Sequence, residues 1–184
     1  MATATADVVG TKIEKIFNAL DVNRNGYVEW SDFQSLIDRY LSEYRLDRND
    51  RRAMALHASY AMFWQELLRH ADVEGDQRLR KDEYIAATRS AIFDSSRFDA
   101  INGFTDAVFD VIDTNGDNEI SKDEFHRFTG NVWGVSQPEA AEAFSALDTD
   151  GDGLISRPEF VRASREFFLS NDPSSPGSVL FGRI

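Results

Sequence analysis

The sequence predicts an all-α fold assembled from four copies of one helix–loop–helix unit. Three observations support this fold class. Four acidic windows of twelve residues share one pattern, apolar or aromatic residues flank each window at the same offsets, and the stretches between the windows have the periodicity of amphipathic helices. The windows begin at Asp21, Asp72, Asp113 and Asp148 and read DVNRNGYVEWSD, DVEGDQRLRKDE, DTNGDNEISKDE and DTDGDGLISRPE.

The flanking residues define the helices in each unit. The residue four places before each window and the residue directly after it are apolar or aromatic in all four copies. These offsets put apolar groups on one face of an entering helix and one face of a leaving helix. Capping boxes from Ser121 to Glu124 and from Ser156 to Glu159 mark where two leaving helices begin. The predicted helices cover residues 9–20, 30–45, 49–71, 80–93, 98–112, 121–131, 137–147 and 156–169.

Composition excludes several classes of partner and site. The chain carries 32 acidic and 20 basic residues, a net charge of −12, which disfavours binding to nucleic acid and to anionic membranes. The absence of cysteine excludes disulfides and thiolate metal sites. The N-terminus lacks the features of a secretory signal, and no apolar stretch is long enough to span a bilayer. We therefore expect a soluble cytoplasmic protein.

The acidic windows have the chemistry of a calcium site. Calcium takes roughly six to eight oxygen ligands at about 2.3–2.6 Å. A loop of twelve residues supplies them from side chains at positions 1, 3 and 5, a backbone carbonyl at position 7, position 9 often through water, and a carboxylate at position 12. Position 6 turns sharply with positive φ, which glycine adopts most easily.

The first window, residues 21–32, departs from this pattern at its last residue. Asp32 stands where glutamate is usual, and two asparagines lower the charge that attracts a cation. Because aspartate is shorter, we expect weaker binding than in the fourth window and a tighter shell that also admits Mg²⁺. The expected ligands are Asp21, Asn23, Asn25, the Tyr27 carbonyl, Glu29 and Asp32.

We expect the second window, residues 72–83, to stay empty and to serve only the fold. Gln77 stands at the turn, where a bulky residue with positive φ costs energy. Arg78, Arg80 and Lys81 add positive charge close by. If the window were occupied, its ligands would be Asp72, Glu74, Asp76, the Arg78 carbonyl and Glu83.

The third and fourth windows are expected to bind. In the third, Asn118 occupies the turn, and asparagine is among the few residues that tolerate left-handed geometry. The fourth meets every requirement, with Gly153 at the turn. The expected third-window ligands are Asp113, Asn115, Asp117, the Glu119 carbonyl, Ser121 and Glu124, and those of the fourth are Asp148, Asp150, Asp152, the Leu154 carbonyl, Ser156 and Glu159.

The windows resemble EF-hands, and their layout resembles the sarcoplasmic calcium-binding proteins, including the bacterial member calerythrin. The resemblance implies two EF-hand pairs in one compact body and about three Ca²⁺ ions, in the first, third and fourth loops. Paired EF-hand loops meet through short two-stranded contacts at their eighth positions, so Val28 should lie against Leu79, and Ile120 against Ile155. The pairs should occupy residues 1–94 and 95–169, followed by a tail over residues 170–184.

The tail is expected to dock on the body. Its first part is rich in serine and proline and predicts a linker, whereas Val179, Leu180 and Phe181 form an apolar plug that we expect to fold back. A free interaction motif is the alternative.

Three function classes remain, and none is catalytic, because no nucleophile–histidine–acid set or phosphate-binding loop is present. The body carries only Met54 and Met62 in a phenylalanine-rich core, which favours a calcium buffer over a sensor that exposes a target groove. A photoprotein-like binder of an apolar molecule is the third reading, since Trp30, Trp64 and Trp133 could line a cavity. We expect packed aromatics instead, in a monomer whose protein target, if any, the sequence does not identify.

Overall fold

The computed structural model describes residues 7–71, 75–93 and 98–183, and the all-α prediction is confirmed. Within these ranges short strands are the only β structure. The helices are α1 (Val8–Leu20), α2 (Trp30–Tyr44), α3 (Arg51–Ala71), α4 (Lys81–Phe93), α5 (Phe98–Ile112), α6 (Lys122–His126), α7 (Gln137–Leu147) and α8 (Arg157–Leu169). The strands are β1 (Tyr27–Glu29), β2 (Arg78–Arg80), β3 (Glu119–Ser121) and β4 (Leu154–Ser156).

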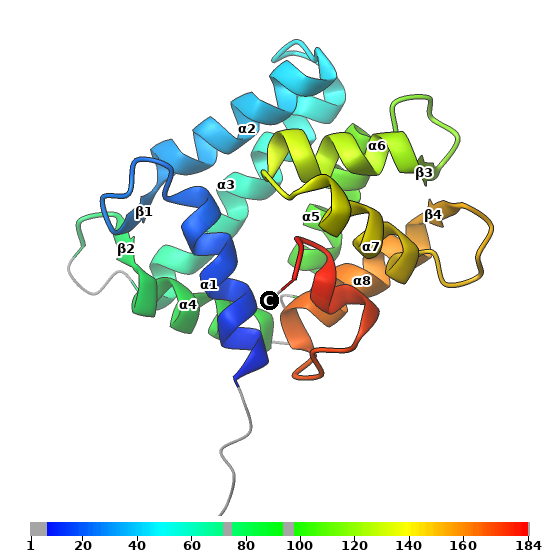
Figure 1. The fold of residues 1–184 in the computed structure, drawn as a ribbon. Coiled ribbons are helices and arrows are strands. Elements are labelled where there is room, and N and C mark those ends of the chain that lie inside the picture. Colours follow the sequence, from blue (N-terminus) through cyan, green and yellow to red (C-terminus); the bar gives the residue numbers. More distant parts are fainter. Residues whose placement is uncertain (1–6, 72–74, 94–97, 184) are drawn as a thin grey trace, which may run out of the picture.

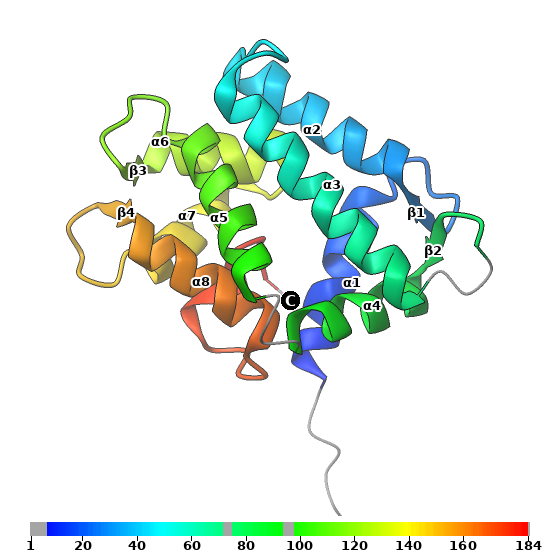
Figure 2. The ribbon, with the colours of Figure 1, turned by 180° about the vertical axis from the view of Figure 1, so that it is seen from behind.

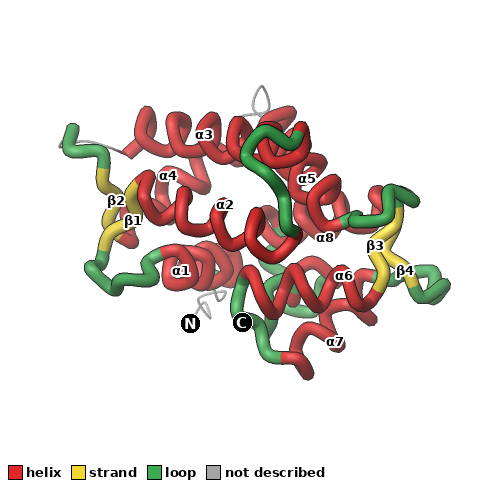
Figure 3. Tube along the Cα trace, turned by 90° about the horizontal axis from the view of Figure 1, so that it is seen from above, coloured by secondary structure: helices red, strands yellow, loops and turns green. Residues whose placement is uncertain are grey.

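Two small antiparallel sheets join the loops in pairs. In the first sheet Val28 lies opposite Leu79, and in the second Ile120 lies opposite Ile155, as predicted. All four side chains are fully buried. Alternation along each strand therefore turns the central residue into the core and leaves its neighbours beside the loops. The two sheets, each with its pair of loops, lie at opposite ends of the molecule (Figures 1 and 3).

Helices from the two halves share one continuous core. Helix α3 packs along α5, α1 packs against α8, and the end of α2 meets the segment that follows α6 (Figure 2). Aromatic rings fill the contact: Tyr60 meets Phe104 edge-on at 4.8 Å between ring centroids, and Tyr40 stacks on Phe128 at 6.2 Å. Large apolar surfaces buried in this way supply most of the stabilisation of a helical body.

The sixth helix departs from the prediction of a regular helix over residues 121–131. Helix α6 ends at His126, and the chain continues as a π-helical segment, η2 (Arg127–Val132). Gly130 lies within it, and Thr129 Oγ1 donates to the carbonyl of Phe125 at 2.8 Å. Such widened turns are rare and occur mostly as single turns within α-helices. Directly after η2, Trp133 Nε1 donates to the Tyr40 hydroxyl at 3.1 Å and so ties this segment to α2.

The tail lies against the body. After α8 it forms a short 3₁₀ helix, η3 (Pro176–Val179), and passes between α1 and the last two helices (Figure 1). Leu180 is 2% exposed, and the Phe181 ring contacts Trp133 and Phe167 with centroid distances of 4.7 and 5.0 Å. These side chains fill part of the core themselves.

A buried lysine fastens the tail to the first helix. Lys12 in α1 is fully buried, and its Nζ donates to the carbonyls of Glu166 and Ser170 at 3.0 and 2.7 Å and to Ser178 Oγ at 3.1 Å. Burial lowers the pKa of Lys12 to about 8, although the nearby carboxylates of Glu166 and Asp172 oppose the shift. The lysine thus caps the end of α8 and holds the turn that leads into η3.

Two further predictions concern boundaries and membranes. The predicted division between residues 94 and 95 lies outside the described residues, so the two-pair division of the chain stays a prediction. No helix within the described ranges combines the length and apolar character needed to cross a bilayer.

Candidate metal sites

The backbone of all four loops turns in the same way at two described positions, the fourth and the sixth. The sixth residue has positive φ in every copy, including Gln77 at 57° and Asn118 at 67°. Gln77 therefore adopts the turn despite the strain expected from its side chain. The fourth residue also has positive φ in every copy, and the prediction did not cover this position. Three loops have glycine there, whereas the first has Arg24 at 56°.

In the first, third and fourth loops, the carboxylate of the first residue organises the turn. Asp148 Oδ1 accepts from the Gly151 amide at 2.8 Å and Oδ2 accepts from the Gly153 amide at 3.0 Å. Asp113 accepts in the same way from Gly116 and Asn118, and Asp21 from Asn25 and Gly26, all at 2.7–3.0 Å. Residues at positions 3 and 5 of the loops repeat the motif with amides two residues further on.

The glutamates at position 12, which close the third and fourth loops, are Glu124 and Glu159. Each accepts hydrogen bonds from four donors. Glu159 accepts from the amide and hydroxyl of Thr149 at 2.8 and 2.7 Å and from the amide and hydroxyl of Ser156 at 2.9 and 2.8 Å. Burial raises the pKa of Glu159, but these bonds together outweigh it and lower the pKa to about 2. The carboxylate is therefore ionised and oriented.

The third loop repeats this arrangement. Glu124 accepts from Thr114 and Ser121 through the same four groups, at 2.6–2.9 Å. Burial acts to raise its pKa here too, and the hydrogen bonds again lower it overall. The two threonines were not among the predicted site residues. The sequence feature that could have identified them is the recurrence of threonine at the second position of these two windows. The first window has Val22 at that position.

The first loop holds its closing residue less firmly. Asp32 accepts only from the Glu29 amide, at 2.9 Å. Burial raises the pKa of Asp32, and the negative charges of Asp21 and Glu29 raise it further against that one bond. The shorter side chain thus lacks the donors that fix Glu124 and Glu159.

Carboxylate oxygens converge where a cation would sit. One oxygen from each of Asp148, Asp150 and Asp152 lies within 4.8 Å of the other two. Asp113, Glu124 and Glu159 are buried, and no lysine or arginine of the described residues forms a salt bridge with them. Buried negative charges need a compensating cation. An all-oxygen set of this kind fits a hard cation such as Ca²⁺.

The carbonyl-bearing residues lie where the pattern requires them. Tyr27, Glu119 and Leu154 begin β1, β3 and β4, directly after the turn of their loops. In the first loop, Asn23 Oδ1 accepts from the Asn25 amide and Asn25 Oδ1 accepts from the Tyr27 amide. In the third loop, Asn115 Nδ2 donates a hydrogen bond of 2.6 Å to Asp117 Oδ2.

The second loop differs because its own arginine holds one of its carboxylates. Arg78 donates to Asp76 Oδ2 from Nε at 3.1 Å and from Nη2 at 3.0 Å, and its guanidinium stacks 4.9 Å from the centre of the Tyr27 ring. Glu83 accepts from the Arg80 amide at 2.9 Å. The other two expected ligands, Asp72 and Glu74, lie outside the described residues.

A small apolar cavity of about 120 Å³ lies where the two halves meet. Its lining includes Tyr60, Phe104, Phe128 and Trp133. Apolar cavities of about 150 Å³ hold a molecule the size of benzene. Of the three tryptophans, Trp133 lines this space, whereas Trp64 is part of the buried core and Trp30 packs against that core.

Comparison with known proteins gives consistent matches. The family model for an EF-hand domain pair matches residues 106–165, and the model for an EF hand matches residues 13–37. The sarcoplasmic calcium-binding protein of Perinereis vancaurica tetradentata is 34% identical over 97% of this chain and 99% of that protein. Calerythrin of Saccharopolyspora erythraea is 28% identical over 77% of this chain and 81% of its own.

A solved structure of a Streptomyces coelicolor calcium-binding protein, described in terms of prokaryotic calcium-mediated regulation, is 31% identical. It superposes with a TM-score of 0.73 and covers 87% of this chain and 97% of that one. Since near-complete coverage at this identity accompanies the four-loop layout, the chain belongs to the sarcoplasmic calcium-binding protein family of EF-hand proteins.

Proposed function

We propose that this chain is a cytoplasmic calcium buffer that binds three Ca²⁺ ions, in its first, third and fourth loops. The observation that carries the proposal is the pair of closing glutamates, Glu124 and Glu159, each buried and oriented by four donors without a described cationic partner. The relatives named for calcium binding support the choice of metal. When bound, calcium would supply the positive charge that these carboxylates lack.

The proposed ligands follow the oxygen positions of each loop. Because Asp32 is short and poorly supported, the first site should be the weakest of the three for Ca²⁺, and its smaller shell should accept Mg²⁺. The ligand sets are Asp21, Asn23, Asn25, Tyr27, Glu29 and Asp32; Asp113, Asn115, Asp117, Glu119 and Glu124; and Asp148, Asp150, Asp152, Leu154 and Glu159.

We assign the second loop no ion. Arg78 already places a cation on Asp76, at 3.0–3.1 Å, so a metal would have to displace that pair and face the displaced guanidinium. The loop still contributes Leu79 to the first sheet, which supports a structural role.

A buffer suits the molecule better than a sensor. Four large apolar side chains are exposed within the described ranges, and they are spread over three elements: Val22 in the first loop, Met54 and Met62 in α3, and Leu169 at the end of α8. Leu180 and Phe181 occupy apolar surface that a target helix would otherwise use. The chain thus covers its own core.

A calcium-dependent regulator is the second candidate, because the Streptomyces coelicolor protein is described in terms of regulation. Binding of a hydrophobic dye separates the two. For a buffer, calcium should leave dye fluorescence unchanged or lower it. A severalfold increase on adding calcium would favour the regulator.

Site-specific titration tests the metal assignment. Glu124→Gln, Glu159→Gln and Asp32→Asn should each lower the number of ions bound per chain by one, because each removes the charge that closes one loop. Asp123→Asn is a matched control, since it removes one acidic charge from the third loop at an exposed position that is not a proposed ligand. The assignment is wrong if the three loop variants and the control bind equally.

A further inference from the structure

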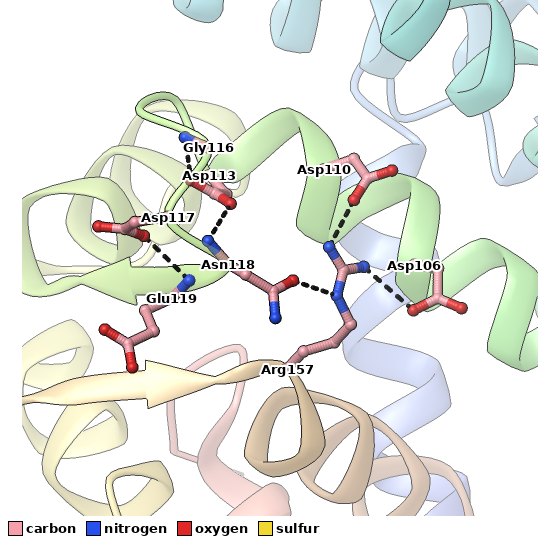
Figure 4. A network of polar contacts seen from close by, with 8 residues as sticks. All are labelled: Asp106, Asp110, Asp113, Gly116, Asp117, Asn118, Glu119 and Arg157. Carbon is pink, nitrogen blue, oxygen red and sulfur yellow. Dashed lines mark hydrogen bonds and ion pairs between the residues drawn. The ribbon is translucent and has the colours of Figure 1, made fainter.

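One side chain of the fourth loop reaches across to the third. Arg157 follows β4 and opens α8, yet its Nε donates to Asn118 Oδ1 at 2.8 Å (Figure 4). Its two terminal nitrogens donate to Asp106 at 3.2 Å and Asp110 at 2.6 Å, on the helix that enters the third loop. The guanidinium also lies 4.1 Å from the centre of the Phe109 ring. All three guanidinium nitrogens of Arg157 therefore donate to residues of the third loop and of the helix that enters it.

Asn118 is the residue at which this contact affects a metal site. It holds the left-handed turn of the third loop at φ 67°, and its amide donates to Asp113 Oδ2 at 2.9 Å. Asp113 is the first proposed ligand of that loop. Arg157 therefore fixes the side chain of the residue whose backbone orients a ligand.

The first pair of loops provides an internal comparison. Lys81 stands at the same loop position as Arg157, and it also reaches the helix entering the partner loop, with Nζ 2.9 Å from Glu14 Oε1 and 5.7 Å from the centre of the Phe17 ring. The residue that corresponds to Asn118 in that partner loop is Gly26, which has no side chain to hold. The contact with the entering helix is common to both pairs, whereas the contact with the turn occurs only in the second.

We propose that Arg157 is a positioning residue for the metal site of the third loop. The inference rests on the proposed calcium binding. Without glycine, the third loop depends on its neighbour to keep Asn118 in the binding conformation.

Lysine cannot replace arginine in this role. An ammonium keeps the charge but lacks the planar fork that engages an amide oxygen and two carboxylates at once. Arg157→Lys therefore tests geometry at constant charge. Asn118→Gly tests the contribution of the Asn118 side chain, because glycine adopts the positive φ of the turn without support from Arg157.

The experiment follows each loop separately in the full chain. The amides of Asn118 and Gly153 each donate to the first carboxylate of their own loop, at 2.9 and 3.0 Å, so their NMR resonances report calcium binding loop by loop. Arg157→Lys should weaken calcium binding at the third loop about five- to tenfold and change the fourth loop less than about twofold. In the Asn118→Gly background, followed by the resonance of the new glycine, the same substitution should change the third loop less than about twofold. Lys81→Gln, the matched control, should leave the third loop unchanged.

A metal-free measurement separates this inference from the proposed function. Without calcium, hydrogen exchange of the Asn118 amide should be faster in Arg157→Lys than in the parent. Equal weakening of both loops, an effect that persists in the Asn118→Gly background, or unchanged exchange would overturn the role of Arg157. Failure of the parent to bind calcium at all would instead refute the proposed function.

Discussion

Single residues distinguish the first loop from the third and fourth. Its fourth position holds Arg24 in the left-handed conformation at φ 56°, where the other loops have glycine. A side chain in this region costs about 1 kcal/mol relative to glycine. The arginine also adds positive charge to a loop in which two asparagines already replace carboxylates. Conformation and charge thus both oppose a cation here.

Arg24→Gly should tighten calcium binding at the first loop about five- to tenfold, because it removes about 1 kcal/mol of backbone strain and one repelling charge. Titration calorimetry in the Glu124→Gln/Glu159→Gln background isolates that loop. Arg24→Gln serves as the control, since it removes the charge and keeps the strain, so it should recover only part of the gain. If glycine and glutamine act alike, the strain has no effect on binding.

The closing glutamate of the fourth loop gives a pH prediction for the metal-free protein. Its pKa is about 2 in the folded chain, against an ordinary value of 4.5. The folded state therefore binds a proton more weakly than the unfolded state, so the stabilisation from Glu159 is complete above pH 4.5 and is lost as the pH falls towards 2. The loss is at most about 3 kcal/mol.

Urea unfolding with a chelator, at pH 6 and pH 3, measures this effect. The parent should lose more stability between the two pH values than Glu159→Gln, which has no carboxyl group to titrate at that position. Equal pH dependence of the two proteins would show that the hydrogen bonds from Thr149 and Ser156 do not stabilise the ionised form.

At the scale of elements, the tail and the first helix act as one unit. Lys12 joins them through three bonds, two of them to carbonyls at the end of α8. Lys12→Met keeps most of the apolar stem, removes three charge-assisted hydrogen bonds and leaves the Ser170 carbonyl without a donor, so it should destabilise the fold by about 2 kcal/mol in urea unfolding at pH 7. Relief of the burial of a charged amine opposes this loss and offsets part of the three lost hydrogen bonds.

Lys15→Met is the matched control for Lys12→Met, because Lys15 lies three residues further along α1 and its ammonium makes an exposed hydrogen bond to the Arg183 carbonyl and a charge interaction with Glu139. It should change stability by less than about 0.5 kcal/mol. A Lys12→Met variant as stable as this control would mean that the buried ammonium contributes nothing net.

The elements that were predictable from sequence are those fixed by local pattern. Helix spans follow from apolar spacing, and the pairing of Val28 with Leu79 follows from the resemblance of the windows to EF-hands, whose paired loops meet at their eighth positions. The left-handed Arg24 was not predictable, since nothing in arginine favours positive φ and the turn of the whole loop imposes it. The π-helical segment η2 was not predicted, because apolar spacing over so few residues does not distinguish a widened helical turn from a regular one.

Long-range polar contacts also could not be predicted from the sequence. Arg157 and Asp106 are 51 positions apart, and Lys12 and Ser178 are 166 apart, so no periodicity links them. Both cations look like ordinary surface residues in the sequence. Their partners become visible only when the helices are assembled. The ligand sets lie at the opposite extreme, because each is contained within twelve consecutive residues.

At the scale of the whole molecule, net charge and metal binding are linked. A chain with a net charge of −12 repels itself, and two acidic loop pairs at the ends of the body concentrate that repulsion (Figure 3). Calcium should stabilise the folded chain by mass action, by about 2.7 kcal/mol for each site filled at one hundred times its dissociation constant. Calorimetric melting with calcium should therefore occur well above melting with a chelator, and coincident melting temperatures would contradict this link.

The count of bound ions tests the central claim most directly. Native mass spectrometry of the full chain, in the presence of micromolar calcium, resolves how many ions each molecule carries. We predict three, falling to two in Glu159→Gln and to one in Glu124→Gln/Glu159→Gln. A parent chain that carries no ion, or a count that the closing-residue substitutions leave unchanged, would contradict the proposal that these oxygen-lined loops are metal sites.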